Sequence, residues 1–371
     1  MNAQTYRRRV AELLKTMNGA DTAWIIRPEN RRYLSGFQAD DTQFAESSGS
    51  LLINKRASIL VTDSRYTDEA NAEAPTFEVR TISRDFAEDF PQFVRELKAK
   101  NLGFEEGYLT WGLYQEVSGA LKGTSPAVGL VPLEGVVEGM RSVKDPSEIR
   151  ALEISAEMIS RILDQVISEL APDMTEKEVA WRIEDLARES GAEGLSFPSI
   201  VASGPHSAMP HATPSDRKLR EHEPIVLDTG VRVNGYRSDI TRTIFLGEPE
   251  ARFREIYNIV RQAQLAAVSV IRPGMESTDV DAVARDVIKN AGYGEYFGHS
   301  LGHGVGLAAH EQPRLAPRRP VRLEEGMVVT VEPGIYLPGK GGVRLEEMLV
   351  IEESGSRTLT QSDFFYDFGS A

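Results

Sequence analysis

Residues 224–246 read PIVLDTGVRVNGYRSDITRTIFL, and this stretch predicts a β-hairpin. Asn234 and Gly235 lie between two runs in which apolar and polar residues alternate, which is a strong signal for a two-residue turn. Such a turn pairs Val233 with Tyr236 and fixes the register of both strands. The hairpin therefore indicates antiparallel pairing in the C-terminal part of the chain.

The same register brings two aspartates together. Asp239 faces Gly230, and Asp228 faces Thr241, when the pairing continues along both strands. Side chains alternate with a period of two, so the two aspartates share a face as diagonal neighbours roughly 7 Å apart. They could merely edge a hairpin, but aspartate is disfavoured inside a strand without a partner. We therefore expect a metal ion bound by Asp228 and shared through Asp239.

A second candidate stretch, GHSLGHGVGLAAHEQP at 298–313, contains three of the six histidines. His299, His303 and His310 lie among glycines, which allow the backbone to approach a site closely. Neutral imidazole is a common ligand for transition metals, so the cluster favours a site over three structural histidines. His211, in SAMPHATPSD, is weaker, because an ordinary loop histidine explains it equally well.

Acidic residues also interrupt two apolar runs further along the chain. Glu332 lies in TVEPG, directly after the apolar run 327–331. An isolated charge in a core strand costs several kcal/mol without a cation. Glu346 and Glu347 end the run VRLEE, and neighbouring strand residues face opposite sides. One of these two glutamates points into the site, and the strand pattern does not choose between them.

The acids together predict a cofactor. Four buried carboxylates in one pocket repel each other strongly unless cations are present. Two divalent ions would cancel this charge, and two ions in one site lower the pKa of a shared water and polarise a carbonyl. Carboxylates with one imidazole form a rather hard ligand set, which suits Mn²⁺ best, although Co²⁺ or Zn²⁺ would also bind.

The 371 residues predict two domains joined by a linker. Residues 1–130 alternate helix and strand patterns, with short buried strands at 23–26 and 58–61, and indicate a small non-catalytic α/β domain. Residues 131–145 are the expected linker, where the composition shifts towards Gly, Pro and Val. Residues 146–371 are the expected catalytic domain.

Helix signals frame the strands of this second domain. Pro146 opens a helix that extends to about residue 170, and Thr175 with Glu178 forms a capping-box pattern for the next one. Further helices are expected at about 251–271 and 277–291 among strand-rich text. Helices flanking a mainly antiparallel sheet make an α+β domain.

Composition limits the partners. A formal net charge of −14 argues against general nucleic-acid binding, which requires a basic face. The chain has no cysteine, so neither disulfides nor thiolate ligands are expected. No apolar run approaches the length of a membrane span, and the N-terminus lacks the pattern of a secretory signal. These features predict a cytoplasmic protein without a membrane partner.

Six motifs in order, LDTG, SDITRT, GHGVG, HEQP, VEPG and GVRLEE, resemble the pita-bread metallopeptidases, specifically the group of Xaa-Pro aminopeptidases and Xaa-Pro dipeptidases (prolidases). The run NRRYLSGF at 30–37 resembles the N-terminal domain of that group, so the resemblance covers the whole chain. It implies an α+β pita-bread catalytic domain preceded by a smaller, creatinase-type α/β domain.

The resemblance also implies residue roles. The positions that match the metal ligands of the family are Asp228, Asp239, His303, Glu332 and Glu346. Asp239 and Glu346 match the bridging pair, which favours Glu346 over Glu347. The positions that match substrate-contacting or supporting residues are His211, His299, His310 and Arg344. Glu332 is the best candidate to carry a proton from water to the leaving nitrogen.

The implied activity is hydrolysis of the bond before proline in a short peptide with proline at the second position. An Xaa-Pro aminopeptidase is the leading interpretation, and an Xaa-Pro dipeptidase is the alternative. A non-catalytic pita-bread binding module should have lost ligands, and creatinase works without metal, so the intact ligand set argues against both. A methionine aminopeptidase would lack the N-terminal domain. A homodimer is expected by analogy.

Overall fold

The structure is a computed structural model that describes residues 2–39, 48–82, 86–123 and 127–369. The chain divides into two compact units, Met1–Arg141 and Ser142–Ala371, called here the N-terminal and C-terminal units. Within the described ranges, none of the helices has the length and apolar character needed to cross a bilayer.

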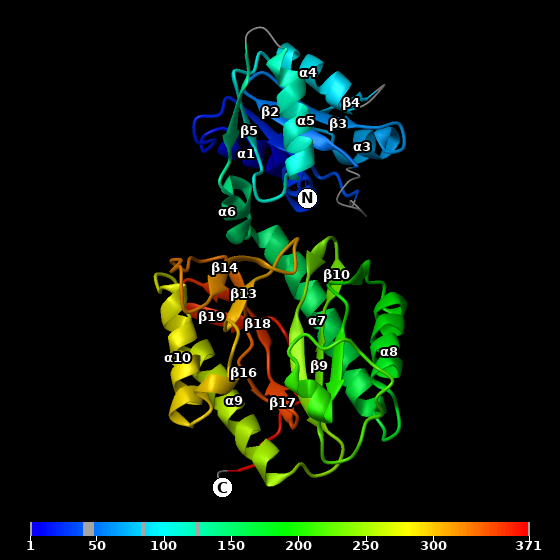
Figure 1. The fold of residues 1–371 in the computed structure, drawn as a ribbon, viewed down its shortest axis with the longest axis vertical. Helices are drawn as coiled ribbons and strands as arrows, with labels where there is room; N and C mark the ends of the chain where they lie inside the picture. The colour runs from blue at the N-terminus through cyan, green and yellow to red at the C-terminus, as the bar shows by residue number, and fades with distance from the viewer. Residues whose placement is uncertain (1, 40–47, 83–85, 124–126, 370–371) are drawn as a thin grey trace. The chain divides into compact units, whose positions relative to one another are not determined.

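The N-terminal unit is built on a six-stranded mixed sheet with the order β4-β3-β2-β1-β5-β6 (Figure 1). Its elements are α1 (Ala3–Leu13), β1 (Thr22–Ile25), α2 (Pro28–Ser35), β2 (Ser50–Asn54), β3 (Ser58–Thr62), α3 (Thr67–Glu73), β4 (Glu78–Thr81), α4 (Phe86–Glu96), β5 (Asn101–Phe104), α5 (Trp111–Lys122), β6 (Gly129–Pro132) and α6 (Val136–Ser142). The two strands expected from sequence are confirmed as β1 and β3. The stretch expected as a linker, 131–145, includes α6.

The C-terminal unit contains four long helices and thirteen strands among its described residues. Its helices are α7 (Pro146–Glu169), α8 (Glu176–Glu189), α9 (Ala251–Val270) and α10 (Ser277–Asn290), with short 3-10 turns η1 (Gly204–Ala208) and η2 (Gly294–Tyr296). Its strands are β7 (Gly194–Leu195), β8 (Ile200–Ser203), β9 (Pro224–Thr229), β10 (Val231–Val233), β11 (Tyr236–Arg237), β12 (Ile240–Phe245), β13 (Gly302–Gly304), β14 (Glu311–Leu315), β15 (Val328–Val331), β16 (Gly334–Leu337), β17 (Gly341–Arg344), β18 (Glu347–Glu352) and β19 (Gly355–Thr358).

Sequence signals explain where the first two helices of this unit begin. Asp145 caps α7 and forms a capping box with Glu148, and Pro146 occupies the first turn, where a missing N–H costs nothing. Thr175 and Glu178 form the second capping box, as the sequence predicts. The helices predicted at 251–271 and 277–291 are confirmed as α9 and α10.

Two helix pairs cover two sets of antiparallel strands (Figure 1). Apolar faces of α7 and α8 pack with β8, β9 and β12 in one core. Apolar faces of α9 and α10 pack with β15, β16, β17 and β18 in the other. This arrangement is the α+β architecture expected from the sequence, and it leaves the strands between the helix pairs free to carry a site.

The hairpin has the predicted register. Val233 pairs with Tyr236, and Asp228 pairs with Thr241. The chain breaks its strand character at Gly230, so β9 and β12 join β8 while β10 and β11 join β7. A Cβ at Gly230 would lie 1.8 Å from the carbonyl oxygen of Ser238. The close approach of the two backbones therefore requires glycine at this position.

Candidate metal centre and active-site cavity

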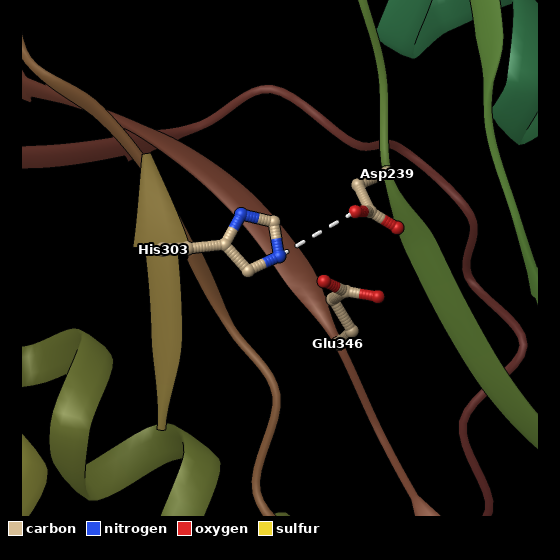
Figure 2. Close-up of side chains that lie close together, drawn as sticks. All are labelled: Asp239, His303 and Glu346. Carbon is tan, nitrogen blue, oxygen red and sulfur yellow. Dashed lines mark ion pairs between the residues drawn. The ribbon is translucent and has the colours of Figure 1, made fainter. Parts of the chain in front are cut away.

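Three candidate ligands converge from separate strands of the C-terminal unit. Ligand atoms of Asp239, His303 and Glu346 all lie within 4.8 Å of one another. Figure 2 shows the imidazole of His303 pointing between the two carboxylates, with its Nε2 3.7 Å from Asp239 Oδ2. Asp239 immediately precedes β12, His303 lies in β13, and Glu346 lies between β17 and β18. This geometry fits a metal ion.

The other two candidate ligands adjoin this group. Glu332 Oε1 lies 3.4 Å from His303 Nε2. Glu332 directly follows β15, rather than lying inside the strand as the sequence suggested. Asp228 Oδ2 accepts a hydrogen bond of 2.5 Å from Arg344 Nη2. Its Oδ1 is buried and has no hydrogen-bond partner among the described residues, so a cation would satisfy an oxygen that the protein leaves unpaired.

His303 is oriented for metal binding by its other ring nitrogen. The Nδ1 of His303 lies 3.0 Å from the carbonyl oxygen of Gly304, which accepts its proton. The lone pair of Nε2 therefore faces the acids, an arrangement typical of metal-ligating histidines. Burial, reinforced by His310, lowers the pKa of His303 to about 3, so the ring is neutral at physiological pH.

The acids of the site are crowded. Burial raises the pKa of Glu332 to about 8. Burial, together with repulsion from neighbouring acids, also raises the pKa of Asp239 and the pKa of Glu346 well above their usual values. Uncompensated negative charge in a buried cavity is unfavourable, and bound divalent cations would reverse these shifts. The donor chemistry and charge therefore fit the predicted metal ions.

The two adjacent glutamates point in opposite directions, as strand alternation requires. Glu346 Oε2 accepts a hydrogen bond of 2.8 Å from the hydroxyl of Thr241, on the metal-centre side. Glu347 Oε1 instead accepts a hydrogen bond of 2.7 Å from Arg242 Nη2. Glu346, and not Glu347, is among the residues that line the cavity.

Arg344 connects the metal centre with a tyrosine that the sequence interpretation missed. Besides Asp228, the guanidinium donates from Nη1 to the hydroxyl oxygen of Tyr336 at 2.9 Å. The Tyr336 hydroxyl donates in turn to His299 Nε2 at 2.9 Å, because His299 Nδ1 donates to Ser300 O. The acidic partner of Arg344 is Asp228. Tyr336 lies in the apolar run GIYL, which reads as core.

All of the candidate residues line one cavity of about 480 Å³. The nine that line it are Asp228, Asp239, His303, Glu332, Glu346, His211, His299, His310 and Arg344. The apolar residues of its lining, called here the apolar wall, come from two segments and are Phe197, Pro198 and Ile200, and Pro210, Ala212 and Pro214. Arg314 also lines the cavity, and sequence reasoning missed it, since one arginine in a polar strand carries no signal.

Known families match both units. Residues 150–353 match the model of Metallopeptidase family M24, and residues 7–143 match the Creatinase/Prolidase N-terminal domain. The chain belongs to metallopeptidase family M24. The expected pita-bread fold with a creatinase-type N-terminal domain is thereby confirmed, and the M24 assignment makes divalent metal ions the expected cofactor.

Relatives match the chain over nearly its whole length. An uncharacterized peptidase of Bacillus subtilis is 39% identical over 93% of this chain and 94% of its own. A structure named Xaa-Pro dipeptidase from Bacillus anthracis is 38% identical, with a TM-score of 0.90, over 97% of this chain and 98% of its own. A structure named X-Pro aminopeptidase from Thermotoga maritima is 38% identical, with a TM-score of 0.84, over 95% of this chain and 97% of its own. Both alternative activities thus occur among relatives of this M24 peptidase.

Proposed function

We propose that this M24 peptidase hydrolyses the bond between an N-terminal residue and proline, with two divalent metal ions as cofactors. One observation carries the proposal: five metal-ligand candidates and an apolar wall line the same 480 Å³ cavity. A small cavity with convergent polar groups beside an apolar wall is suited to a short peptide.

The metal ions would be held by Asp228, Asp239, His303, Glu332 and Glu346, with Asp239 and Glu346 shared. Oxygen-rich donors with one imidazole suit Mn²⁺, which we propose as the preferred ion, over Co²⁺ or Zn²⁺. When bound, such ions lower the pKa of a shared water and polarise the substrate carbonyl.

Glu332 is proposed to move the proton. Without metal, burial raises the pKa of this carboxyl to about 8. Bound cations would lower that pKa, so that the carboxylate is ionised and free to accept a proton. Glu332 can therefore accept a proton from the attacking water and pass it to the leaving proline nitrogen.

Two histidines, His310 and His211, are proposed to bind the substrate, and His299 is proposed to support the site behind them. Burial lowers the pKa of His310 and lowers the pKa of His299 to about 4, so both rings are neutral near pH 7. A neutral ring still has one N–H, and His310 and His211 can donate it to the developing oxyanion or the peptide backbone. His299 is held by the Tyr336 hydroxyl, which in turn accepts from Arg344. Arg344 also orients Asp228.

Selection of proline is proposed to rest on the apolar wall. The nitrogen of a bond before proline has no N–H, so the site needs no acceptor for it. Phe197, Ile200 and Pro210 offer the apolar surface that a pyrrolidine ring requires. The same wall does not by itself limit the length of the peptide.

Arg314 favours a second candidate function, the Xaa-Pro dipeptidase. Its guanidinium lines the cavity and helps to lower the pKa of His303 and the pKa of His310, so a positive charge lies close to the histidines. A cation there could bind the free carboxylate of a dipeptide. An aminopeptidase instead has to leave that end open.

Peptide length tests both candidates. With Mn²⁺ added, release of the first residue is measured for Xaa-Pro, Xaa-Pro-Xaa and Xaa-Ala substrates. Cleavage of both proline peptides supports the aminopeptidase, whereas cleavage of Xaa-Pro alone supports the dipeptidase. In the second case Arg314→Ala should raise KM for Xaa-Pro at least about tenfold, as expected for one lost charged hydrogen bond, while the exposed control Arg318→Ala should not. Inactivity with every metal would refute the proposal.

A homodimer and a cytoplasmic location stay predictions. Sedimentation equilibrium would test the first, and localisation of the tagged full chain in its native cell would test the second.

A further inference from the structure

A fully buried arginine lies behind the metal centre. Arg242, in β12, has 0% of its surface exposed. Its Nη1 donates to two backbone carbonyl oxygens, that of Thr241 at 3.0 Å and that of Glu346 at 2.7 Å. A single guanidinium nitrogen therefore holds together the strand that follows Asp239 and the candidate bridging residue Glu346.

The two residues that Arg242 joins are also bonded to each other. The amide of Glu346 donates to Thr241 O at 3.0 Å. The hydroxyl of Thr241 donates to Glu346 Oε2 at 2.8 Å. The backbone position of Thr241 thus sets the direction of the Glu346 carboxylate. Any shift in the Arg242 guanidinium acts on both.

The other half of the guanidinium faces the C-terminal segment, defined here as residues 359–366. Nη2 donates to Glu347 Oε1 at 2.7 Å and to the carbonyl oxygen of Ser362 at 2.9 Å. The Thr360 hydroxyl donates to the same Glu347 carboxylate. The ring of Phe365 lies 4.1 Å from the Arg242 guanidinium carbon. The C-terminal segment therefore completes the surroundings of this cation.

The segment is itself anchored. The Ser362 hydroxyl donates to Asp164 Oδ1 at 2.6 Å, and the Gln361 amide donates to Ser160 Oγ at 2.9 Å. Both acceptors belong to α7. Arg261 covers the Phe365 ring, with its guanidinium carbon 3.5 Å from the ring centroid. Phe365 thus lies against two cations and restricts how Arg242 can move.

We propose that Arg242 is a positioning residue through which the C-terminal segment sets the metal affinity of the site. Arg242 is not among the residues that line the cavity. It fixes the backbone of Glu346 and of Thr241 so that the bridging carboxylate keeps its direction. Partners behind metal ligands typically change metal affinity by about 10–100-fold when they are lost. The inference rests on the metal centre in the proposed function, but not on the choice of substrate.

The test compares two adjacent phenylalanines in the full-length protein. Phe365→Ala removes the ring from Arg242, and Phe364→Ala, whose side chain is 37% exposed, is the matched control. Mn²⁺ alone is titrated into each metal-free protein by calorimetry. Phe365→Ala should weaken Mn²⁺ binding about tenfold, at the lower end of the effect of lost supporting partners, and Phe364→Ala should leave it unchanged. At saturating Mn²⁺, KM for the peptide should stay at the wild-type value.

A direct variant, Arg242→Lys, should weaken Mn²⁺ binding more than Phe365→Ala, since an ammonium cannot match the planar donors of a guanidinium. If Arg242→Lys does not fold, the Mn²⁺ affinity of Phe365→Ala still tests the proposal. Wild-type Mn²⁺ affinity in a less stable Phe365→Ala protein would overturn the proposal, because it would show a purely structural role. Wild-type protein that binds Mn²⁺ but cleaves no Xaa-Pro peptide would refute the substrate and leave this inference intact.

Discussion

Glu346 and Glu347 are neighbours in sequence and are both buried, yet their surroundings differ in how they balance a negative charge. Glu347 faces Arg242 and the hydroxyl of Thr360, so the protein itself neutralises it. Glu346 faces the Thr241 hydroxyl and the other acids of the cavity. Burial raises the pKa of both, but the pKa of Glu346 is raised well above its usual value.

The contrast teaches that burial of an acid does not by itself mark a functional site. The Glu347 region is complete, because its cation is part of the chain. In the proposed function, the Glu346 region is completed by a cation that comes from solution. Four experiments test this distinction.

The largest effect is expected from Glu346→Gln. Loss of a shared ligand should lower kcat/KM by at least about 10³-fold, comparable to the loss of a principal electrostatic group in an active site. The metal-free variant should be as stable as the wild type or more stable, because one repelling charge is gone. Peptide hydrolysis and chemical unfolding measure the two quantities. Asp239→Asn should behave in the same way, and unchanged turnover in either variant would contradict the shared-ligand assignment.

Glu347→Gln should show the opposite pattern. It leaves Arg242 buried without its charged partner, so the free energy of unfolding should fall by about 3 kcal/mol. At saturating Mn²⁺ the folded fraction should keep activity within about tenfold of wild type, because no metal ligand is lost. Unfolding in urea and a metal-saturated assay check both. A variant that is stable but inactive would place Glu347, not Glu346, in the site.

Removing the metal ion should lower the free energy of unfolding mainly through the Glu346 region. Mn²⁺ at about 100 times its Kd should stabilise the wild type by about 2.7 kcal/mol relative to the chelated protein. Glu346→Gln should show a much smaller gain, and Glu347→Gln, which loses a partner of Arg242 but no ligand, should keep about half of it, as expected for an affinity about tenfold weaker. Thermal unfolding with and without a chelator gives the comparison. An equal gain in all three proteins would mean that Mn²⁺ binds elsewhere.

The smallest effect, taken over a single pH unit, is expected from pH. The raised pKa of Glu332, about 8, means that the folded metal-free protein holds a proton that the unfolded chain releases near pH 4.5. This acid therefore makes the metal-free protein less stable as pH rises from about 4.5 to about 8. Mn²⁺ must displace the same proton, so its affinity should rise about tenfold per pH unit over that interval. A Mn²⁺ affinity that does not change between pH 6 and 8 would contradict the raised pKa of Glu332.

Local sequence rules were sufficient for the elements with short-range determinants. The Asn234-Gly235 turn fixed the register that pairs Asp228 with Thr241. Pro146 located the start of α7, and the Thr175–Glu178 capping box located the start of α8. These features depend on residues a few positions apart. The candidate ligands could be chosen as acids and histidines in apolar or glycine-rich surroundings, but strand alternation left Glu346 and Glu347 equivalent until the resemblance distinguished them.

Residues that act through distant contacts could not be predicted. Tyr336 reads as a core residue, and its bonds to Arg344 and His299 depend on how separate strands meet. Arg242 was a detectable anomaly, since a cation inside an apolar strand needs a buried partner. Its partners, Glu347 and the carbonyl of Ser362, are more than a hundred positions away, and the sequence alone does not identify them.

The spacing of the ligands has a consequence for biosynthesis. Asp228 lies in β9, whereas Glu346 follows β17, and Arg242 contacts Ser362 still later in the chain. A growing polypeptide on the ribosome therefore presents an incomplete ligand set until nearly all of these residues have been translated. The raised pKa of Glu332 and that of Glu346 would let protons occupy the acids first. If metal ions bind as proposed, their loading would follow synthesis, and each arriving ion would displace protons from these acids.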